Sequence, residues 1–135
     1  MPTISAAARN AMLDAATALI DAGAGAGYIE IRTGSKPASP AVAASGTLLV
    51  TITFNEPAFG AAVAGVATLD AAPALTGQAV ADGTAGWARV YDSDANAIMD
   101  GGCGTSGEFV NLDALAILTG RDVTVTGGTL TQPAE

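Results

Sequence analysis

The hydrophobic pattern of this 135-residue chain changes its period once, at the glycine-rich segment 23–27. Before that segment, apolar residues recur at three- and four-residue spacing, which indicates one face of an α-helix. After it, short apolar runs alternate with polar residues, and turn-forming residues interrupt them about every 8–12 residues, which is typical of short antiparallel strands. The sequence therefore predicts a mainly β protein, an antiparallel β-sandwich or jelly roll, that begins with one α-helix.

The helix is expected over residues 4–22, a segment that is rich in alanine and contains no glycine or proline. Thr3 or Ser5 can cap its start by accepting a backbone hydrogen bond, and Gly23 is expected to end it. A helix of this length is only marginally stable alone, so it needs a surface on which to pack.

One apolar stripe runs along this helix and is formed by Met12, Leu13, Ala16, Leu19 and Ile20. The stripe either packs on the body of the same chain or docks as an arm on a neighbouring molecule, with the glycine-rich segment as its hinge. We therefore divide the chain into an N-terminal helix and hinge, residues 1–27, and a β-sandwich body, residues 28–135.

The body is expected to contain about eight short strands. Their expected ranges are 28–32, 47–54, 59–69, 76–81, 84–91, 97–99, 108–112 and 122–131, with a short turn or strand over 115–119. Asp82 and Gly83 form a dipeptide typical of tight turns, so we expect a hairpin between the two strands that flank it.

Within the strand expected over residues 84–91, Trp87, Arg89 and Tyr91 point to one face, and the small apolar residues between them point to the other. A lone tryptophan in a strand is more often a core or interface anchor than a platform for sugars. We therefore expect Trp87 and Tyr91 to lie on a packed face of a sheet.

Large apolar side chains are scarce in this chain. Alanine and glycine number 31 and 17, whereas leucine, valine, isoleucine and phenylalanine together make up 29 of the 135 residues. Alanine buries little apolar area, and each glycine raises the entropic cost of folding. A monomer built in this way either packs very regular β-structure tightly or gains stability by burying surface on a partner, and we expect both. We therefore expect a homo-oligomer, preferably a dimer, with a trimer as the other possibility.

Charge and composition exclude several classes of protein. With 5 basic against 13 acidic residues, the chain is not expected to bind nucleic acid electrostatically. It contains no histidine, which removes the commonest acid–base group and metal ligand. No apolar run approaches the roughly 20 residues that span a bilayer, and the N-terminus does not resemble a signal peptide. We expect a protein made in a cytoplasm that is not an enzyme, holds no cofactor and does not bind a membrane.

Asp92, Asp94 and Asn96 have the spacing of the first three ligands in a calcium-binding loop. Ala97 and Cys103 stand where that loop requires a glycine and a bidentate glutamate. The expected structure is an Asp/Asn-rich hairpin turn, and a weakly held surface ion is the alternative that stays open.

The glycine-rich segment 101–107 resembles a phosphate-binding loop but lacks the lysine that such a loop requires. Cys103, the single cysteine, cannot form an internal disulfide and has no histidine to activate it as a nucleophile. We expect a loop between two strands there, with Cys103 acting as a small apolar residue.

Seven segments of the chain, in order along nearly its whole length, resemble a family of small structural proteins encoded by tailed phages and prophages. They are residues 4–14, 20–27, 29–40, 46–49, 55–60, 87–94 and 100–107. The resemblance implies a capsid cement, or head-decoration, protein with a jelly-roll or sandwich body. Such proteins sit as oligomers on the outside of the icosahedral head, where they bridge subunits of the major capsid protein and stabilise the shell.

The resemblance transfers no catalytic, cofactor-binding or metal-binding residue. The partners it implies are the major capsid protein and the chain itself, in a virion. For these contacts the expected interface residues are Met12, Leu13, Leu19, Ile20, Trp87 and Tyr91. Two alternatives are a phage tail-tip or fibre-attachment module, and a carbohydrate-binding module or lyase-like enzyme, which would need an exposed aromatic platform.

Overall fold

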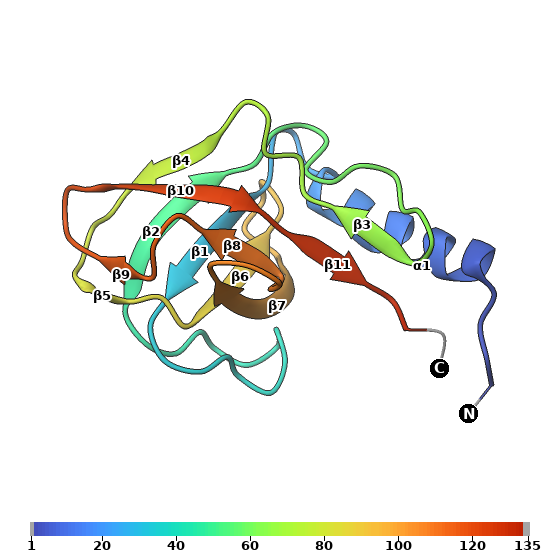
Figure 1. Ribbon diagram of the computed structural model, residues 1–135, viewed down its shortest axis with the longest axis horizontal. Helices are drawn as coiled ribbons and strands as arrows, with labels where there is room; N and C mark the ends of the chain where they lie inside the picture. Colours follow the sequence, from blue (N-terminus) through green and yellow to red (C-terminus); the bar gives the residue numbers. More distant parts are fainter. Residues whose placement is uncertain (1, 134–135) are drawn as a thin grey trace.

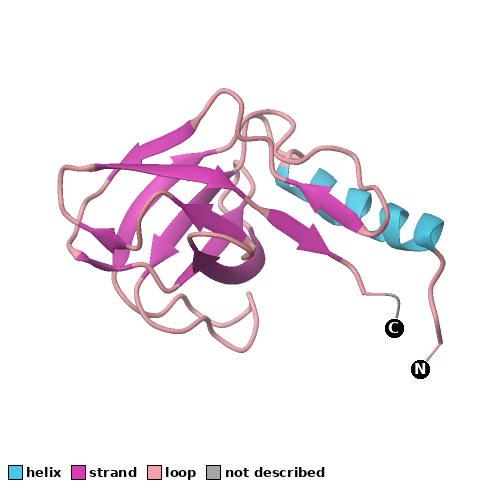
Figure 2. Cartoon of the chain, in the orientation of Figure 1, coloured by secondary structure: helices cyan, strands magenta, loops and turns pink. Residues whose placement is uncertain are grey.

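The computed structural model describes residues 2–133 and is mainly β with a single N-terminal helix in that range (Figures 1 and 2). The elements are α1 Ala6–Ile20, β1 Tyr28–Arg32, β2 Leu48–Thr53, β3 Val66–Thr68, β4 Leu75–Gln78, β5 Gly83–Thr84, β6 Trp87–Tyr91, β7 Ala97–Gly104, β8 Val110–Leu112, β9 Ala116–Ile117, β10 Asp122–Gly127 and β11 Thr129–Thr131. The prediction of a mainly β chain with one N-terminal helix is confirmed.

The helix begins and ends close to where the sequence places it. Ser5 is the N-cap, and its hydroxyl accepts a hydrogen bond from the backbone N–H of Ala8 at 3.1 Å. This bond satisfies one of the free N–H groups of the first turn, as expected for a serine cap. At the other end Asp21 is the C-cap, two residues before Gly23.

Seven strands form the main sheet in the order β2-β1-β6-β7-β8-β10-β4. Neighbouring strands are antiparallel except β7 and β8, which pair in parallel through Cys103 and Val110. Two small two-stranded sheets, β3 with β11 and β5 with β9, flank the main sheet. In Figure 1 the helix lies beside β3, at the end of the molecule that also holds β11.

The main sheet curls until its two edge strands almost meet. Just beyond β4, the N–H of Val80 donates a hydrogen bond to the carbonyl of Leu49 in β2 at 2.8 Å. Gly77 in β4 lies so close to β2 that a Cβ there would overlap the carbonyl of Thr51. The result is a nearly closed sheet, and glycine is required at Gly77 because two backbones approach closely.

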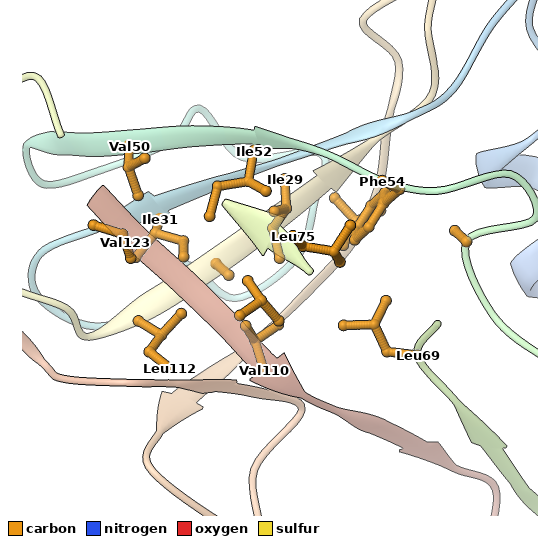
Figure 3. Close-up of a cluster of buried hydrophobic side chains, with 14 of the residues drawn as sticks. Ile29, Ile31, Val50, Ile52, Phe54, Leu69, Leu75, Val110, Leu112 and Val123 are labelled. Carbon is orange, nitrogen blue, oxygen red and sulfur yellow. The ribbon is translucent and has the colours of Figure 1, made fainter. Parts of the chain in front are cut away.

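The hydrophobic core lies inside this curl. Side chains from β1, β2, β4, β8 and β10 meet there in one cluster (Figure 3). The labelled members are Ile29, Ile31, Val50, Ile52, Phe54, Leu69, Leu75, Val110, Leu112 and Val123. Phe59 adds to the cluster, and its ring stacks on that of Phe109 and tilts against that of Phe54. Most of the buried large apolar residues thus belong to one core cluster.

The hairpin predicted at Asp82 and Gly83 is wrong. Gly83 and Thr84 pair instead with β9, and β4 pairs with β10. The strand predicted over 59–69 is also shorter, because Ala64 and Gly65 turn the chain at positive φ and leave β3 as its only regular part. Long-range pairing, which a local turn signal does not report, decides the first outcome, and a local turn at positive φ decides the second.

The glycine-rich segment 101–107, predicted as a loop between two strands, is divided. β7 continues through Gly104, and residues 105–107 lie in the loop that leads to β8. Gly101 pairs with Ala88 of β6, and the ring of Phe109 lies over it so closely that a Cβ would overlap the ring. Gly101 therefore permits close packing on a paired strand, and the expectation of a loop is corrected for residues 101–104.

Candidate functional site

The apolar stripe predicted on the helix is divided between two faces. Leu13 and Ile20 are buried against the body, with Thr17 between them. Met12 and Leu19 are 47% and 54% exposed. At 100° per residue, Leu13, Thr17 and Ile20 share one face, whereas Met12 and Leu19 lie on a flank about 100° away. One half of the predicted set holds the helix to its own body, and the other half faces solvent.

Polar side chains also attach the helix to the body. Carboxylate oxygens of Asp14 and Asp21 accept hydrogen bonds from the backbone N–H groups of Ala62 at 2.8 Å and Ala58 at 3.1 Å. The side-chain oxygen of Asn10 accepts one from Gly65 at 2.9 Å. The sequence interpretation missed these contacts. The sequence did show that the three polar residues share one flank of the helix. Their partners, however, are backbone N–H groups in loops, which no sequence pattern identifies.

The glycine-rich segment after the helix packs closely on the turn between β6 and β7. The N–H of Gly25 donates to the hydroxyl of Ser93 at 3.2 Å. A Cβ on Gly27 would overlap the carbonyl of Tyr91, and one on Gly23 would overlap Ser93. Close approach of two chain segments accounts for these glycines.

Trp87, Arg89 and Tyr91 share one face of β6, as predicted, and they lie outside the core cluster. On the neighbouring strands, Glu30 of β1 and Asp100 of β7 stand opposite Arg89 in the strand register. We call this surface of β1, β6 and β7 the outer face.

The centre of the outer face is a buried ion pair. The Nε and Nη2 atoms of Arg89 donate to the two carboxylate oxygens of Asp100 at 2.7 and 2.9 Å, and both side chains are only 4% exposed. The hydrogen bonds to Asp100 raise the pKa of the Arg89 guanidinium above its usual range. The guanidinium also lies 5.3 Å from the ring centroid of Trp87, within the range of a cation–π contact.

Tyr91 connects this ion pair to the edge of the outer face. Its hydroxyl donates to the Glu30 carboxylate at 3.0 Å, and its ring stacks on Tyr28 with centroids 4.9 Å apart. Burial first, and then the hydrogen bond to Glu30, raises the pKa of Tyr91. Glu30 also pairs with Arg32 at 3.1 Å. The outer face is therefore a connected polar and aromatic network, of which the sequence indicated only the three residues of β6.

Residues 34–46, which we call the cover loop, lie on the outer face. The carbonyl of Ser39 accepts a hydrogen bond from Nη2 of Arg89 at 3.4 Å. Trp87 is only 1% exposed, and within residues 2–133 its buried indole Nε1 has no hydrogen-bond partner. Trp87 is thus buried although it lies outside the core cluster, and the cover loop contacts β6 two residues further on, at Arg89.

The segment with Asp92, Asp94 and Asn96 is a hairpin turn between β6 and β7. The Asp92 carboxylate accepts hydrogen bonds from the backbone N–H of Asp94 at 3.0 Å and of Asn96 at 2.9 Å, and from the Asn96 amide at 3.0 Å. The bonds from Asn96 contribute most to lowering the pKa of Asp92. This carboxylate closes the turn, as turn chemistry predicts.

Cys103 is partly buried in β7. Burial, with a smaller contribution from Glu108, raises the pKa of its thiol to about 12. The thiol is therefore protonated at neutral pH and is a poor nucleophile.

A small cavity of about 120 Å³ lies beside β9 and the start of β10, lined by Asp113, Ile117, Leu118 and Arg121 among others. Pockets for organic ligands are usually about 300 Å³ or larger. Within residues 2–133, no three histidine, cysteine, aspartate or glutamate side chains are grouped as a metal ion would require. The outer face and the exposed flank of the helix are therefore the surfaces with the most distinctive chemistry.

Across residues 2–133, no helix combines the length and the apolar character needed to cross a membrane. Comparisons of the chain with protein-family models, with curated proteins and with solved structures found no match.

Proposed function

We propose that this chain is a capsid cement, or head-decoration, protein of a tailed phage. In this proposal it is not an enzyme, it binds the outside of the icosahedral head as a homo-oligomer, preferably a dimer, and it bridges subunits of the major capsid protein. The resemblance of the sequence to small phage structural proteins suggests the role. The structural observation that carries it is an exposed, uncharged flank of α1 on a strongly acidic protein.

This flank consists of Met12 and Leu19, two helical turns apart, with the exposed Ala8 and Ala15 beside them. The chain has a formal net charge of −8, yet these positions carry no charge. The single carboxylate of α1, Asp14, lies about 160° around the helix from Met12, where it accepts a hydrogen bond from the N–H of Ala62. A partner can therefore cover the Met12 and Leu19 flank without burying an unpaired charge.

The different positions of the apolar side chains on the helix, some buried and some exposed, support the same proposal. Leu13 and Ile20 dock the helix on its own body, so Met12 and Leu19 stay at a fixed position relative to the sheet. A rigid apolar surface binds with less entropic cost than a flexible arm. Small contacts of this kind become effective when many copies repeat them over one shell.

We also propose that the body has the fold of a jelly-roll-like sandwich. In this arrangement β1 and β2 would supply one wall of the core, and β4, β8 and β10 the other. Side chains from these five strands meet in one cluster, which supports the proposal (Figure 3). Residues 1–27 would then form the contact unit and residues 28–135 the supporting body.

The test compares Leu19→Asp with Leu118→Asp on heads stripped of this protein. The two leucines are matched, because they are 54% and 51% exposed. Leu19→Asp is expected to lower occupancy of the heads at least tenfold by placing a charge in the contact, and Leu118→Asp is expected to bind as the wild type does. If the two variants bind the stripped heads equally, the Met12 and Leu19 flank is not the contact surface and this part of the proposal is contradicted.

The role itself is tested by heating particles with and without the protein and measuring DNA release. Decorated heads are expected to retain DNA to higher temperature. Cryo-imaging of the virion gives the location, and density on the tail would support the tail-tip or fibre-attachment alternative and contradict the cement role.

A further inference from the structure

Strand β11 has one paired edge and one free edge. It belongs to a two-stranded sheet in which β3 is its partner, and it pairs with no second strand among residues 2–133. In Figure 1, β11 lies at the margin of the molecule on the side away from β3. The unpaired N–H and C=O groups of such an edge are a template for another strand.

The register shows which backbone groups of β11 face outward. The carbonyl of Gly128 and the N–H of Gln132 make hydrogen bonds of 3.0 and 2.9 Å to the residues that flank β3. Bonded positions alternate along an antiparallel ladder, so Leu130 bonds towards β3, and the N–H and C=O groups of Thr129 and Thr131 point away from it. None of these four outward groups has a hydrogen-bond partner within residues 2–133.

The side chains of β11 leave this edge open to another strand. Leu130 packs on the core cluster but is only partly buried, and Thr129 and Thr131 point to the opposite face and are exposed. Edge strands that stay single commonly carry charged side chains, which repel an added strand. Residues 123–133 contain no charged side chain, so two copies can meet here without placing like charges opposite each other.

The two ends of β11 lie beside opposite charges. The Arg9 guanidinium and the carbonyl of Gln132 both face the glycine that precedes β3, so a cation lies beside the last residues of the strand. At the first residues, a Cβ on Gly128 would overlap the carbonyl of Phe109, and the exposed Glu108 is the neighbour of Phe109 in the chain. An antiparallel pair of identical strands therefore brings the basic end of each copy to the acidic end of the other.

We propose that the free edge of β11 binds the same edge of a second copy of this chain, about a two-fold axis. Thr129 then exchanges two backbone hydrogen bonds with Thr131 of the partner subunit, and the axis repeats this pair to give four bonds. Leu130 lies opposite Leu130 of the partner subunit at the closely spaced, non-hydrogen-bonded position, where each leucine covers the exposed part of the other.

A strand of identical sequence satisfies the four outward groups, the two leucines and the charged ends at once. The two small sheets become one sheet in the order β3-β11-β11-β3. This dimer rests on the homo-oligomer of the proposed function, to which it gives an interface, and it does not require phage heads.

Sedimentation equilibrium of the full chain tests the interface in solution. Because β11 is short, we expect a weak dimer, with a dissociation constant on the order of 0.1 mM. Thr131→Pro removes an outward N–H and no bond to β3, so the dimer loses two of its four bonds. We expect the dissociation constant to rise at least about thirtyfold. Thr131→Val keeps the N–H and is the matched control, expected to dimerise as the wild type does.

The outcomes separate this interface from the other proposals. A wild-type chain that stays monomeric up to about 1 mM would overturn the dimer, whether or not the protein binds phage heads. If Thr131→Pro dimerises as well as Thr131→Val, the contact lies elsewhere, which overturns the β11 interface and leaves the homo-oligomer in place. Thermal unfolding of both variants checks that they fold.

Cross-linking tests the register without relying on the proline variant. Leu130→Cys, combined with Cys103→Ala, places two thiols opposite each other across the axis at a spacing that suits a disulfide. Mild oxidation is expected to give mainly covalent dimers. Leu118→Cys with Cys103→Ala is the control, because Leu118 is 51% exposed and more accessible than the partly buried Leu130. Equal yields of dimer from the two variants would indicate random collision and would overturn the two-fold pairing of β11.

Discussion

Arg89 on β6 holds Asp100 on β7 through two parallel hydrogen bonds, and neither side chain is more than 4% exposed. Removing one member of a buried pair leaves the other charge without compensation. We expect Asp100→Asn to lower the free energy of unfolding by about 3 kcal/mol, measured by chemical denaturation.

The control for this prediction is the pair between Arg32 and Glu30 on the same face, whose side chains are 18% and 17% exposed. Arg32→Gln is expected to cost less than about 1 kcal/mol, because solvent screens this pair. If both variants lose the same stability, the buried pair has no special role in holding β6 to β7.

The docking of the helix gives a second prediction. Asp14→Ala removes the acceptor for the N–H of Ala62 and is expected to lower the free energy of unfolding by about 2 kcal/mol. Asp14→Asn keeps a side-chain oxygen at that position and is expected to recover most of this loss. Thermal unfolding of both variants, with the exposed Asp122→Ala as a control, measures the effect. A loss as large in Asp122→Ala would point to net charge as the cause.

Glycines in the strands give a third prediction. Gly101→Ala places a Cβ into the ring of Phe109 and is expected to destabilise the fold by about 1–3 kcal/mol. At Gly127, also in a strand, a Cβ would meet no described atom within 4 Å, so Gly127→Ala is expected to be neutral or slightly stabilising. Equilibrium denaturation of both variants measures the free energy of unfolding. It separates the effect of atomic overlap, expected only in Gly101→Ala, from the effect on backbone entropy, expected in both. Similar denaturation curves for the two variants would argue against close packing at Gly101.

The pKa of Cys103 gives a fourth prediction. Because burial raises it from 9.0 to about 12, the folded protein binds a proton that the unfolded chain releases between these values. The stabilising contribution is therefore complete below pH 9 and is lost as the pH rises towards 12. Cys103→Ala, which cannot titrate, is expected to lose less stability over this range than wild type. If the free energy of unfolding falls equally with pH in the two proteins, the raised pKa of Cys103 is contradicted.

Thiol labelling checks the same assignment. At pH 9 about half of an ordinary thiol is ionised, but only about one thousandth of a thiol with a pKa of about 12 is ionised. Alkylation of Cys103 is expected to be slow in the folded protein and fast after denaturation.

The sequence predicted those elements that depend on local chemistry. Ser5 caps the helix, and β1 and β2 occupy the expected segments, because apolar periodicity and capping are properties of neighbouring residues. It could not predict that β4 pairs with β10, or that β7 continues through its glycines, because both follow from contacts between residues distant in the chain.

The same limit applies to the candidate site. Alternation within one strand placed Trp87 and Tyr91 on a common face with Arg89. The partner of Arg89 was not predictable, since Asp100 reaches it only through the register between β6 and β7. The exposure of Leu19 and the burial of Ile20 likewise depend on the angle at which the helix meets the body.

The meeting of β4 with β2 also bears on how copies of this protein behave at high concentration. An open sheet offers a row of free backbone groups along its outermost strands, to which another molecule can add a strand and start aggregation. Here the bond from Val80 to Leu49 engages backbone groups where the two outermost strands come together. At this edge of the main sheet, crowded copies would then meet mainly through side chains, which favours reversible association over the growth of fibrils.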